Sequence, residues 1–255
     1  MNSEALQGKR ALVTGAGSRL GQAIAVELGS AGMHVGVHYH TNLEGARETA
    51  RQIAVTSGRA QIFAADLSSR QQARQLVDST TEALGGLDLL VLSAGTFENV
   101  TYDAIDDDTW DRSLNLNLAA PFAVAQRATG ALKRSRGNIV FITCASVIRP
   151  FRGYLPYVVA KAGVYQLMRA LAMQLAPQVR VNAVAPGMVL PPVDMSPQQI
   201  ERVTEQSLLR SVGSPDDVVR AVMYLASSPF VTGEQLLVDG GRSLARPSQS
   251  VLERL

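Results

Sequence analysis

The stretch VTGAGSRLGQAIA, residues 13–25, joins a short apolar run to a helical pattern and decides the fold class. Gly15 allows a tight turn, Gly17 keeps the loop small, and Gly21 permits close packing of helix against strand. Backbone N–H groups at a helix start, with the positive end of its dipole, suit a pyrophosphate. The strict G-x-G-x-x-G spacing is not met, because Leu20 stands where its third glycine belongs. A plain turn therefore stays possible, but its place before a series of strand–helix units favours a nucleotide site.

Outward from this turn, short β-branched runs alternate with longer helical patterns. Strands are expected at 10–14, 34–39, 60–66, 87–93, 137–143, 179–185 and 234–240, and helices at 20–32, 44–58 and 214–227. Apolar strands that alternate with helices predict a parallel sheet covered on both faces. We therefore expect an α/β fold: a single doubly wound domain over residues 1–255, with its core at about 9–244 and a polar tail at 245–255.

Composition limits the classes of function. The chain has 255 residues, of which 46% are hydrophobic and 18% charged, and its net charge is +2. This balance predicts a globular protein without the electrostatic signature of a nucleic-acid or membrane partner. One cysteine cannot form an internal disulfide, and the start, MNSEALQGKR, has no apolar signal core. The expected location is cytoplasmic, and no metal site is expected.

The end of the second expected strand bears on the choice of cofactor. NAD sites commonly place a carboxylate there, on the ribose hydroxyls, but VHYHTN (37–42) contains no Asp or Glu. Arg19 in the glycine turn, with His38 and His40, is placed to meet a 2′-phosphate instead. The sequence therefore favours NADPH over NADH. Asp66, after the third strand, is expected either to contact an adenine amino group or to cap the following helix.

Tyr157 and Lys161 form the candidate catalytic pair. They lie four residues apart in GYLPYVVAK (153–161), so they share one face of the helix expected after the fifth strand. A phenol has a pKa of roughly 10 and needs help to exchange a proton near neutral pH. A nearby lysine cation and an oxidised nicotinamide ring would both favour the phenolate. The pair therefore predicts an acid and its electrostatic helper in the crevice where the strands end.

From about Lys9 to Leu244 the chain resembles the short-chain dehydrogenases/reductases. The resemblance rests on the T-G-x-x-x-x-x-G turn (14–21), an asparagine in LNLNLAAPF (114–122), the Y-x-x-x-K pair and Pro186-Gly187. It implies a seven-stranded Rossmann sheet, a nicotinamide cofactor and a homotetramer acting on a small molecule.

The resemblance also implies roles for individual residues. Tyr157 would donate the proton, while Lys161 would bind the nicotinamide ribose and lower the pKa of the tyrosine. Asn117 would shape a relay water through its helix backbone, with Asn115 as the less favoured choice. The residues expected to hold the cofactor are Gly15, Ser18, Arg19, Leu20, Gly21, His40, Asp66, Leu67, Ala94, Gly95, Tyr157, Lys161, Pro186, Gly187 and Val189.

Within the family, the chain resembles pteridine reductases and their bacterial relatives. These share the arginine at Arg19, HYH (38–40) and an ending like DGGRSLAR (239–246). The resemblance implies a pterin-like substrate stacked on Phe97, since a flat ring prefers a flat partner. Phe97 as a loop anchor is the alternative. The other residues expected to line the substrate pocket are Ser146, Tyr154 and Met188.

Cys144 stands thirteen residues before Tyr157, where most members of the family carry serine and pteridine reductases carry aspartate. A thiol is a weak hydrogen-bond donor and polarises a carbonyl poorly. Strand alternation places Ser146 on the same face as Cys144 and Thr143 on the opposite face. A small apolar strand end is the alternative role for Cys144.

The expected function is an NADPH-preferring oxidoreductase that transfers a hydride to a pterin-like or other small carbonyl or imine substrate, with Tyr157 as proton donor. A 3-oxoacyl or general ketone reductase is the alternative of the same class. A low-turnover, cofactor-binding redox sensor or scaffold is the alternative of another class. The segment 188–211 is expected to cover the substrate.

Overall fold

Seven parallel strands form one sheet in a computed structural model that describes residues 3–191 and 195–245. The order across the sheet is β3-β2-β1-β4-β5-β6-β7. The strands are β1 (Arg10–Thr14), β2 (His34–Tyr39), β3 (Arg59–Ala64), β4 (Leu89–Leu92), β5 (Asn138–Ile142), β6 (Arg180–Pro186) and β7 (Gln235–Val238). The predicted seven-stranded Rossmann sheet is confirmed. The bounds of the first two strands match the expected ranges, and the other bounds shift by one or two residues.

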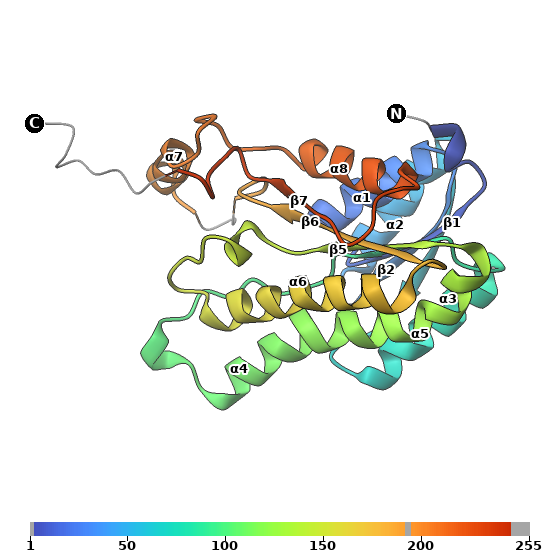
Figure 1. Ribbon diagram of the computed structural model, residues 1–255, viewed down its shortest axis with the longest axis horizontal. Helices are drawn as coiled ribbons and strands as arrows, with labels where there is room; N and C mark the ends of the chain where they lie inside the picture. The colour runs from blue at the N-terminus through green and yellow to red at the C-terminus, as the bar shows by residue number, and fades with distance from the viewer. Residues whose placement is uncertain (1–2, 192–194, 246–255) are drawn as a thin grey trace, which may run out of the picture.

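Helices cover both faces of the sheet, as the apolar strands require (Figure 1). They are α1 (Arg19–Ser30), α2 (Leu43–Ala54), α3 (Arg70–Leu84), α4 (Asp107–Leu114), α5 (Ala120–Ser135), α6 (Leu155–Leu175), α7 (Pro197–Glu205) and α8 (Pro215–Ser227). One apolar cluster joins the sheet to α1, α2 and α8, and a second joins its other face to α3, α5 and α6. The inner strands are buried on both sides, which explains their continuous apolar sequences.

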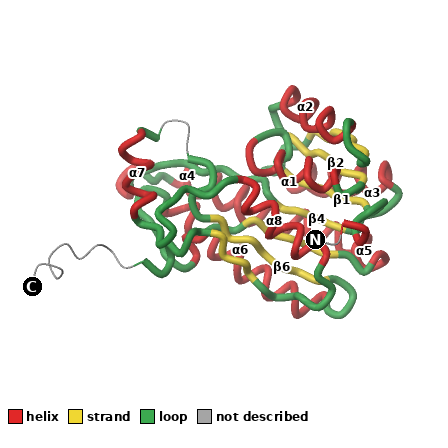
Figure 2. Tube along the Cα trace, turned by 90° about the horizontal axis from the view of Figure 1, so that it is seen from above, coloured by secondary structure: helices red, strands yellow, loops and turns green. Residues whose placement is uncertain are grey.

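The strand order reverses between β1 and β4, and this reversal fixes where a ligand can bind. β1 pairs with β2 on one side and with β4 on the other, so the connections leave in opposite directions. In such sheets a crevice opens beyond the carboxyl ends of the two central strands. Figure 2 shows the sheet running through the middle of the molecule, with loops gathered at one end.

The segment 188–211 contains a helix that the sequence analysis did not predict. α7 begins after Ser196, whose hydroxyl accepts from Gln199 N while the Gln199 side chain accepts from Ser196 N. This reciprocal cap stabilises a short helix within a segment expected to be a loop. Part of that segment, 192–194, and most of the expected tail lie outside the described residues.

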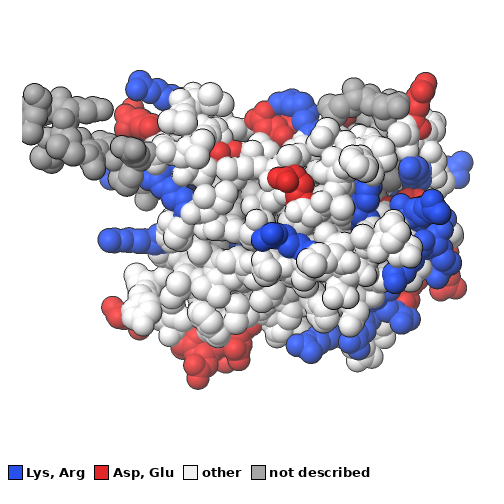
Figure 3. Space-filling view, viewed as in Figure 1, with Lys and Arg blue, Asp and Glu red and all other residues white. Residues whose placement is uncertain are grey.

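Charges of both signs are distributed over the face shown in Figure 3, and acidic groups gather where α4 begins. That acidic group consists of the exposed Asp106, Asp107, Asp108 and Asp111. Over the described ranges, no helix is both long and apolar enough to span a bilayer. The same ranges contain no cluster of three or more His, Cys, Asp or Glu side chains suited to a metal ion.

Candidate active site

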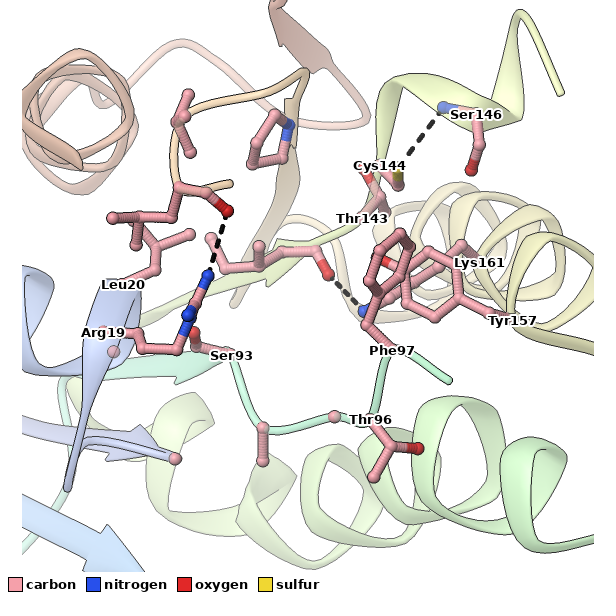
Figure 4. A pocket seen from close by; sticks show the side chains of 18 of the residues that line it. Arg19, Leu20, Ser93, Thr96, Phe97, Thr143, Cys144, Ser146, Tyr157 and Lys161 are labelled. Atoms are coloured by element: carbon pink, nitrogen blue, oxygen red, sulfur yellow. Dashed lines mark hydrogen bonds between the residues drawn. The ribbon is translucent and has the colours of Figure 1, made fainter. Parts of the chain in front are cut away.

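A cleft of about 970 Å³ lies beyond the carboxyl ends of the central strands and contains nearly all the predicted site residues. Its two ends are the glycine turn before α1 and the segment between β5 and α6, residues 143–154, which we call the β5–α6 loop. The volume is at the upper end of the usual range for ligand pockets. Figure 4 shows the side chains of both ends turned toward the same space.

The glycine turn has the shape expected of a phosphate cradle. Gly15 has a φ of +69°, and a Cβ there would lie 2.9 Å from the Cα of Ala94. A Cβ on Gly21 would collide with the Gly15 carbonyl. Ser18 precedes α1 in extended conformation, and its side chain makes no capping hydrogen bond to the described residues. The N–H groups of the first helical turn therefore stay available to an anion, which fits a pyrophosphate.

His38 does not lie where a 2′-phosphate could meet it, so this expectation is wrong. Its ring is only 2% exposed, and its Nδ1 accepts a hydrogen bond from Gly15 N at 3.0 Å. The proton must then sit on Nε2, which donates to the Ala65 carbonyl at 3.1 Å. Burial lowers the pKa of His38 to about 4, so the ring is neutral. His38 therefore ties the glycine turn to the end of β3.

The other residues of the predicted 2′-phosphate site line the cleft. His40 is exposed at its edge. Arg19 has a φ of +51° and its Nη2 donates to the carbonyls of Leu190 at 2.9 Å and Pro191 at 3.3 Å (Figure 4). The arginine thus bridges the glycine turn and the segment that follows β6. Asn42, which the sequence analysis did not single out, donates from Nδ2 to Gly17 O at 2.9 Å and caps α2 through Gly45 N.

Asp66 and Leu67 follow β3 and line the cleft beside His40. Asp66 Oδ1 accepts from the Ser68 hydroxyl at 2.7 Å and from Ser68 N at 2.9 Å, and these bonds lower the pKa of the carboxyl. The N-cap of α3 is Ser69 rather than Asp66, because Ser69 Oγ accepts from Gln72 N. Asp66 therefore shapes the turn before the helix and does not cap it.

The side chain of Asn117 holds the loop that follows β4. It is fully buried in a π-helical turn, Asn115–Ala119, whereas Asn115 is exposed. Its Oδ1 accepts from Thr96 N at 3.1 Å and its Nδ2 donates to Ser113 Oγ at 3.3 Å. A Cβ on Gly95 would lie 2.5 Å from the Asn117 Oδ1. The asparagine thus holds the loop through its side chain, and its closeness to Gly95 fixes that residue at the cleft.

The Tyr157–Lys161 pair lies on α6, with both side chains in the cleft (Figure 4). Lys161 Nζ donates to Ile142 O at 2.8 Å and lies 5.6 Å from the centre of the Tyr157 ring. Burial lowers the pKa of Lys161 to about 8. Burial, followed by the neighbouring Cys144, raises the pKa of Tyr157 well above its usual value. Burial is the largest cause of this shift, so the pKa of Tyr157 does not show the lowering that was expected from Lys161.

Cys144 lies two residues after β5 and lines the cleft together with Ser146, which belongs to a 3₁₀ turn, Ala145–Val147. Thr143 lines the cleft as well, so the expected alternation of faces does not continue beyond the strand. The Cys144 Sγ accepts from Ser146 N at 3.4 Å. The Ser146 hydroxyl is buried and has no hydrogen-bond partner among the described residues. Thr143 instead donates to Gln235 Oε1 at 2.6 Å, on the β7 side. Ser146 therefore brings to the lining of the cleft a hydroxyl that no described residue uses.

Phe97 belongs to an aromatic wall with Tyr154, Tyr157 and Phe151. Its ring stacks on Tyr154, with centroids 4.0 Å apart, and meets Tyr157 edge to face at 4.8 Å. Phe97 is 46% exposed, so one face remains open to the cleft. It thus both anchors its loop and lines the predicted substrate end.

The far side of the cleft comes from the segment after β6. Pro186, Gly187, Met188 and Val189 all line it, and a Cβ on Gly187 would lie 2.7 Å from the Asp239 Cα. The close approach fixes this segment against the end of β7.

Three arginines at the same end were not predicted: Arg149 and Arg152 in the β5–α6 loop and Arg242 after β7. The only sequence signal for the first two is the pair of arginines in RPFRGY (149–154), close before Tyr157. Arg242 is far along the chain and gave no local signal.

Comparisons with known proteins agree with this geometry. The family profile described as "Enoyl-(Acyl carrier protein) reductase" matches residues 15–243. The chain is 35% identical to 3beta-hydroxysteroid dehydrogenase 1 of Eggerthella lenta, over 94% of this chain and 95% of that one. It is 31% identical to a 3-oxoacyl-[acyl-carrier-protein] reductase of Aggregatibacter actinomycetemcomitans, over 90% of this chain and 97% of that one.

Among solved structures, a short-chain dehydrogenase of Burkholderia cenocepacia in complex with NADP superposes with a TM-score of 0.88 at 32% identity, covering 93% of this chain and 99% of the other. None of these three proteins is named as a pteridine reductase. The chain belongs to the short-chain dehydrogenase/reductase family and is an NAD(P)-dependent oxidoreductase.

Proposed function

We propose that this protein is an NADP(H)-preferring ketone reductase with Tyr157 as proton donor. The observation that carries the proposal is that Tyr157 and Lys161 line the same cleft as the glycine turn, where no side chain caps the start of α1. A proton donor and a phosphate cradle in one cleft suit a dinucleotide and a small carbonyl compound held side by side.

The cofactor residues divide the cleft into parts. The pyrophosphate would lie on the glycine turn and the first turn of α1, from Ser18 to Gly21. Arg19, once its guanidinium leaves the carbonyls of Leu190 and Pro191, would meet the 2′-phosphate together with His40. The absence of a carboxylate at 37–42 supports NADP(H) over NAD(H). The adenine would lie by Asp66 and Leu67. The nicotinamide end would lie between two sets of residues, Ala94, Gly95 and Lys161 on one side and Pro186, Gly187 and Val189 on the other.

When bound, the nicotinamide supplies a hydride to the carbonyl carbon. The chain supplies the proton: Tyr157, which burial keeps protonated at neutral pH, donates from its hydroxyl to the carbonyl oxygen. Lys161 is still mostly charged at neutral pH, since its pKa is about 8, and its charge stabilises the phenolate that proton donation leaves. Cys144 and Ser146 would hold the substrate oxygen, and Asn117 would position the loop and a relay water.

A ketone is favoured over a pterin for two reasons. The two curated relatives named above are a hydroxysteroid dehydrogenase and a 3-oxoacyl reductase. Cys144 also replaces the aspartate that the resemblance to pteridine reductases implies at this place, so no carboxyl group is present there to pair with pterin ring nitrogens.

The test is NADPH oxidation, followed by absorbance, with a panel of neutral ketones, 3-oxoacyl thioesters and dihydropterins. We expect turnover of ketones or oxoacyl thioesters by the wild type and none by Tyr157→Phe. If only dihydropterins were reduced, the substrate class would be a pterin and the proposed ketone would be wrong. Tight NADPH binding without turnover of any compound would support the alternative of a cofactor-binding redox protein.

We also infer a homotetramer, as the family resemblance implies. Apolar side chains near the open edge of β7 support this: Phe230 is 99% exposed and Tyr224 is 47% exposed. Light scattering on the purified protein would test it, and a monomeric mass would contradict it.

A further inference from the structure

The substrate end of the cleft carries three arginines that the reaction itself does not use. Arg149 and Arg152 come from the β5–α6 loop and Arg242 follows β7, and all three line the same cleft as Cys144 and Tyr157. Elements distant in the sequence therefore bring three arginines to the lining of one cavity.

These arginines form no ion pair within the described parts of the chain, although the charge of Asp239 offsets part of the effect of burial on the pKa of Arg242. None of the six ion pairs recorded there includes Arg149, Arg152 or Arg242. Asp239 is the nearby acid that lines the cleft, but its Oδ1 accepts from Gly241 N at 2.9 Å and its Oδ2 from Ser243 N at 2.7 Å. Its charge is thus used to hold the turn after β7.

The positive charge is also partly buried. Burial, followed by the repulsion of Arg149, lowers the pKa of Arg242. Like charges that face each other in a partly desolvated cavity are unfavourable unless an anion joins them. Arginine offers a planar fork of donors that matches carboxylate and phosphate oxygens.

We propose that the substrate carries an anionic group, a carboxylate or a phosphate, that Arg149, Arg152 and Arg242 bind while its carbonyl lies at Cys144 and Tyr157. Phe97 and Phe151 of the aromatic wall line the same cavity, and Tyr154, which was expected to line it, supports them from outside the lining. The substrate is therefore a ketone with an apolar body and an anionic end. This inference rests on the proposed ketone reductase and narrows its substrate class.

A structural role for the arginines makes a different prediction. Arg149 Nη1 donates to the carbonyls of Arg242 and Ala245, both at 2.7 Å, and Arg242 Nη2 donates to Gln206 Oε1 at 3.2 Å. If these contacts only fasten the chain after β7, loss of an arginine would weaken turnover of charged and neutral substrates alike. A recognition role would affect the charged substrate selectively.

The experiment compares matched pairs of substrates. One set is a series of oxo acids of increasing length, each with its methyl ester, which removes only the carboxylate charge. A second pair is acetoacetyl-coenzyme A and the uncharged acetoacetyl thioester of N-acetylcysteamine, which removes the phosphates. The ratio of kcat/KM within each pair is measured with NADPH for the wild type, Arg242→Gln and Arg152→Gln.

Arg127→Gln is the matched control. It removes one arginine charge on α5, where Arg127 pairs with Asp78, and it does not line the cleft. Arg152→Gln is the second test variant because Arg152 is exposed and takes no part in the carbonyl bonds that Arg149 makes. It keeps the test valid if Arg242→Gln does not fold.

We expect the wild type to prefer the charged member of one pair by about 10-fold to 100-fold, the range for hydrogen bonds to a charged group. The two pocket variants should lose most of that preference and keep turnover of the neutral member within about threefold. Arg127→Gln should match the wild type. A preference for free acids assigns the carboxylate, and a preference only for the coenzyme A thioester assigns the phosphate.

Two results would overturn the inference: equal kcat/KM for the charged and neutral members in the wild type, or equal losses of kcat/KM on both members in the variants. Neither result would contradict the proposed ketone reductase. If no ketone is reduced, the proposed function fails. The pairs are then compared by calorimetric binding to the NADP⁺-loaded protein. Equal affinity of acid and ester, and of the two thioesters, would overturn the anionic site as well.

Discussion

Replacing Lys161 by methionine should make the cofactor-free protein more stable while it abolishes reduction. Lys161 is only 5% exposed, and burial lowers its pKa from 10.5 to about 8. Each pKa unit corresponds to roughly 1.4 kcal/mol, so charging this residue in the folded state costs about 3 kcal/mol at neutral pH. Methionine has a similar length and carries no charge to desolvate.

Part of the gain is offset by a lost hydrogen bond. The Lys161 Nζ donates to the Ile142 carbonyl at 2.8 Å, and removing the donor costs about 1–2 kcal/mol. We therefore expect a net gain of about 1–2 kcal/mol at neutral pH, which raises Tm by about 2–8 °C in a chain of this size.

The pH dependence identifies the cause. The folded-state pKa of Lys161 is lower than the unfolded value, so the cost is fully present below about pH 8, fades between about 8 and 10.5, and is absent above. The stability difference between Lys161→Met and wild type should then be about 2 kcal/mol smaller at about pH 9.5 than at pH 7.

Denaturant unfolding without cofactor, followed by circular dichroism at the two pH values, measures this difference. Lys133→Met is the control, because it removes a lysine that is exposed on α5 rather than buried. A Lys161→Met protein that is less stable at pH 7, or a difference that does not change with pH, would refute the argument that burial dominates at this site.

Other substitutions test the remaining parts of the cleft. Tyr157→Phe should lower kcat by about 10²–10⁴-fold and leave the NADPH dissociation constant near that of wild type. Arg19→Ala should raise the dissociation constant of NADPH by about tenfold or more and change that of NADH little, as measured by fluorescence titration. His38→Leu removes both hydrogen bonds that hold the glycine turn and should weaken the binding of NADPH and NADH equally. A loss of affinity for NADPH alone would indicate that His38 does contact the 2′-phosphate. Cys144→Ser should raise kcat on neutral ketones several-fold, because a hydroxyl is a better donor to the carbonyl oxygen than a thiol.

The elements that could be predicted are those whose signal is local. β1, the glycine turn and the start of α1 follow one another within a few residues, and each is specified by its own apolar spacing or by a steric need for glycine. The capped start of α8 was predicted for the same reason: Ser214 and Pro215 lie beside it, and Asp217 accepts from Ser214 N at 2.7 Å. The parallel arrangement of the strands follows from the alternation of strands and helices, whereas their order is known only from the structure.

The residues that were missed act across the sheet. His38 appeared to be one of two cofactor histidines, because nothing in VHYHTN shows that one side chain points into the core and the other to solvent. Its partners, Gly15 and Ala65, are 23 and 27 residues away. Arg242 reaches the cleft only because β7 ends beside β6, which a local pattern cannot indicate.

Burial at this site determines which protonation state Tyr157 holds at neutral pH. Reduction needs a protonated phenol, and the raised pKa of Tyr157 keeps the proton in place at neutral pH. Oxidation needs the phenolate, which burial disfavours and which Cys144 supports poorly, because a thiol donates a weak hydrogen bond. A serine at 144 would help the phenolate more. A reduction would therefore start from the protonated phenol, and Lys161, mostly charged below pH 8, would stabilise the phenolate that forms as the proton leaves.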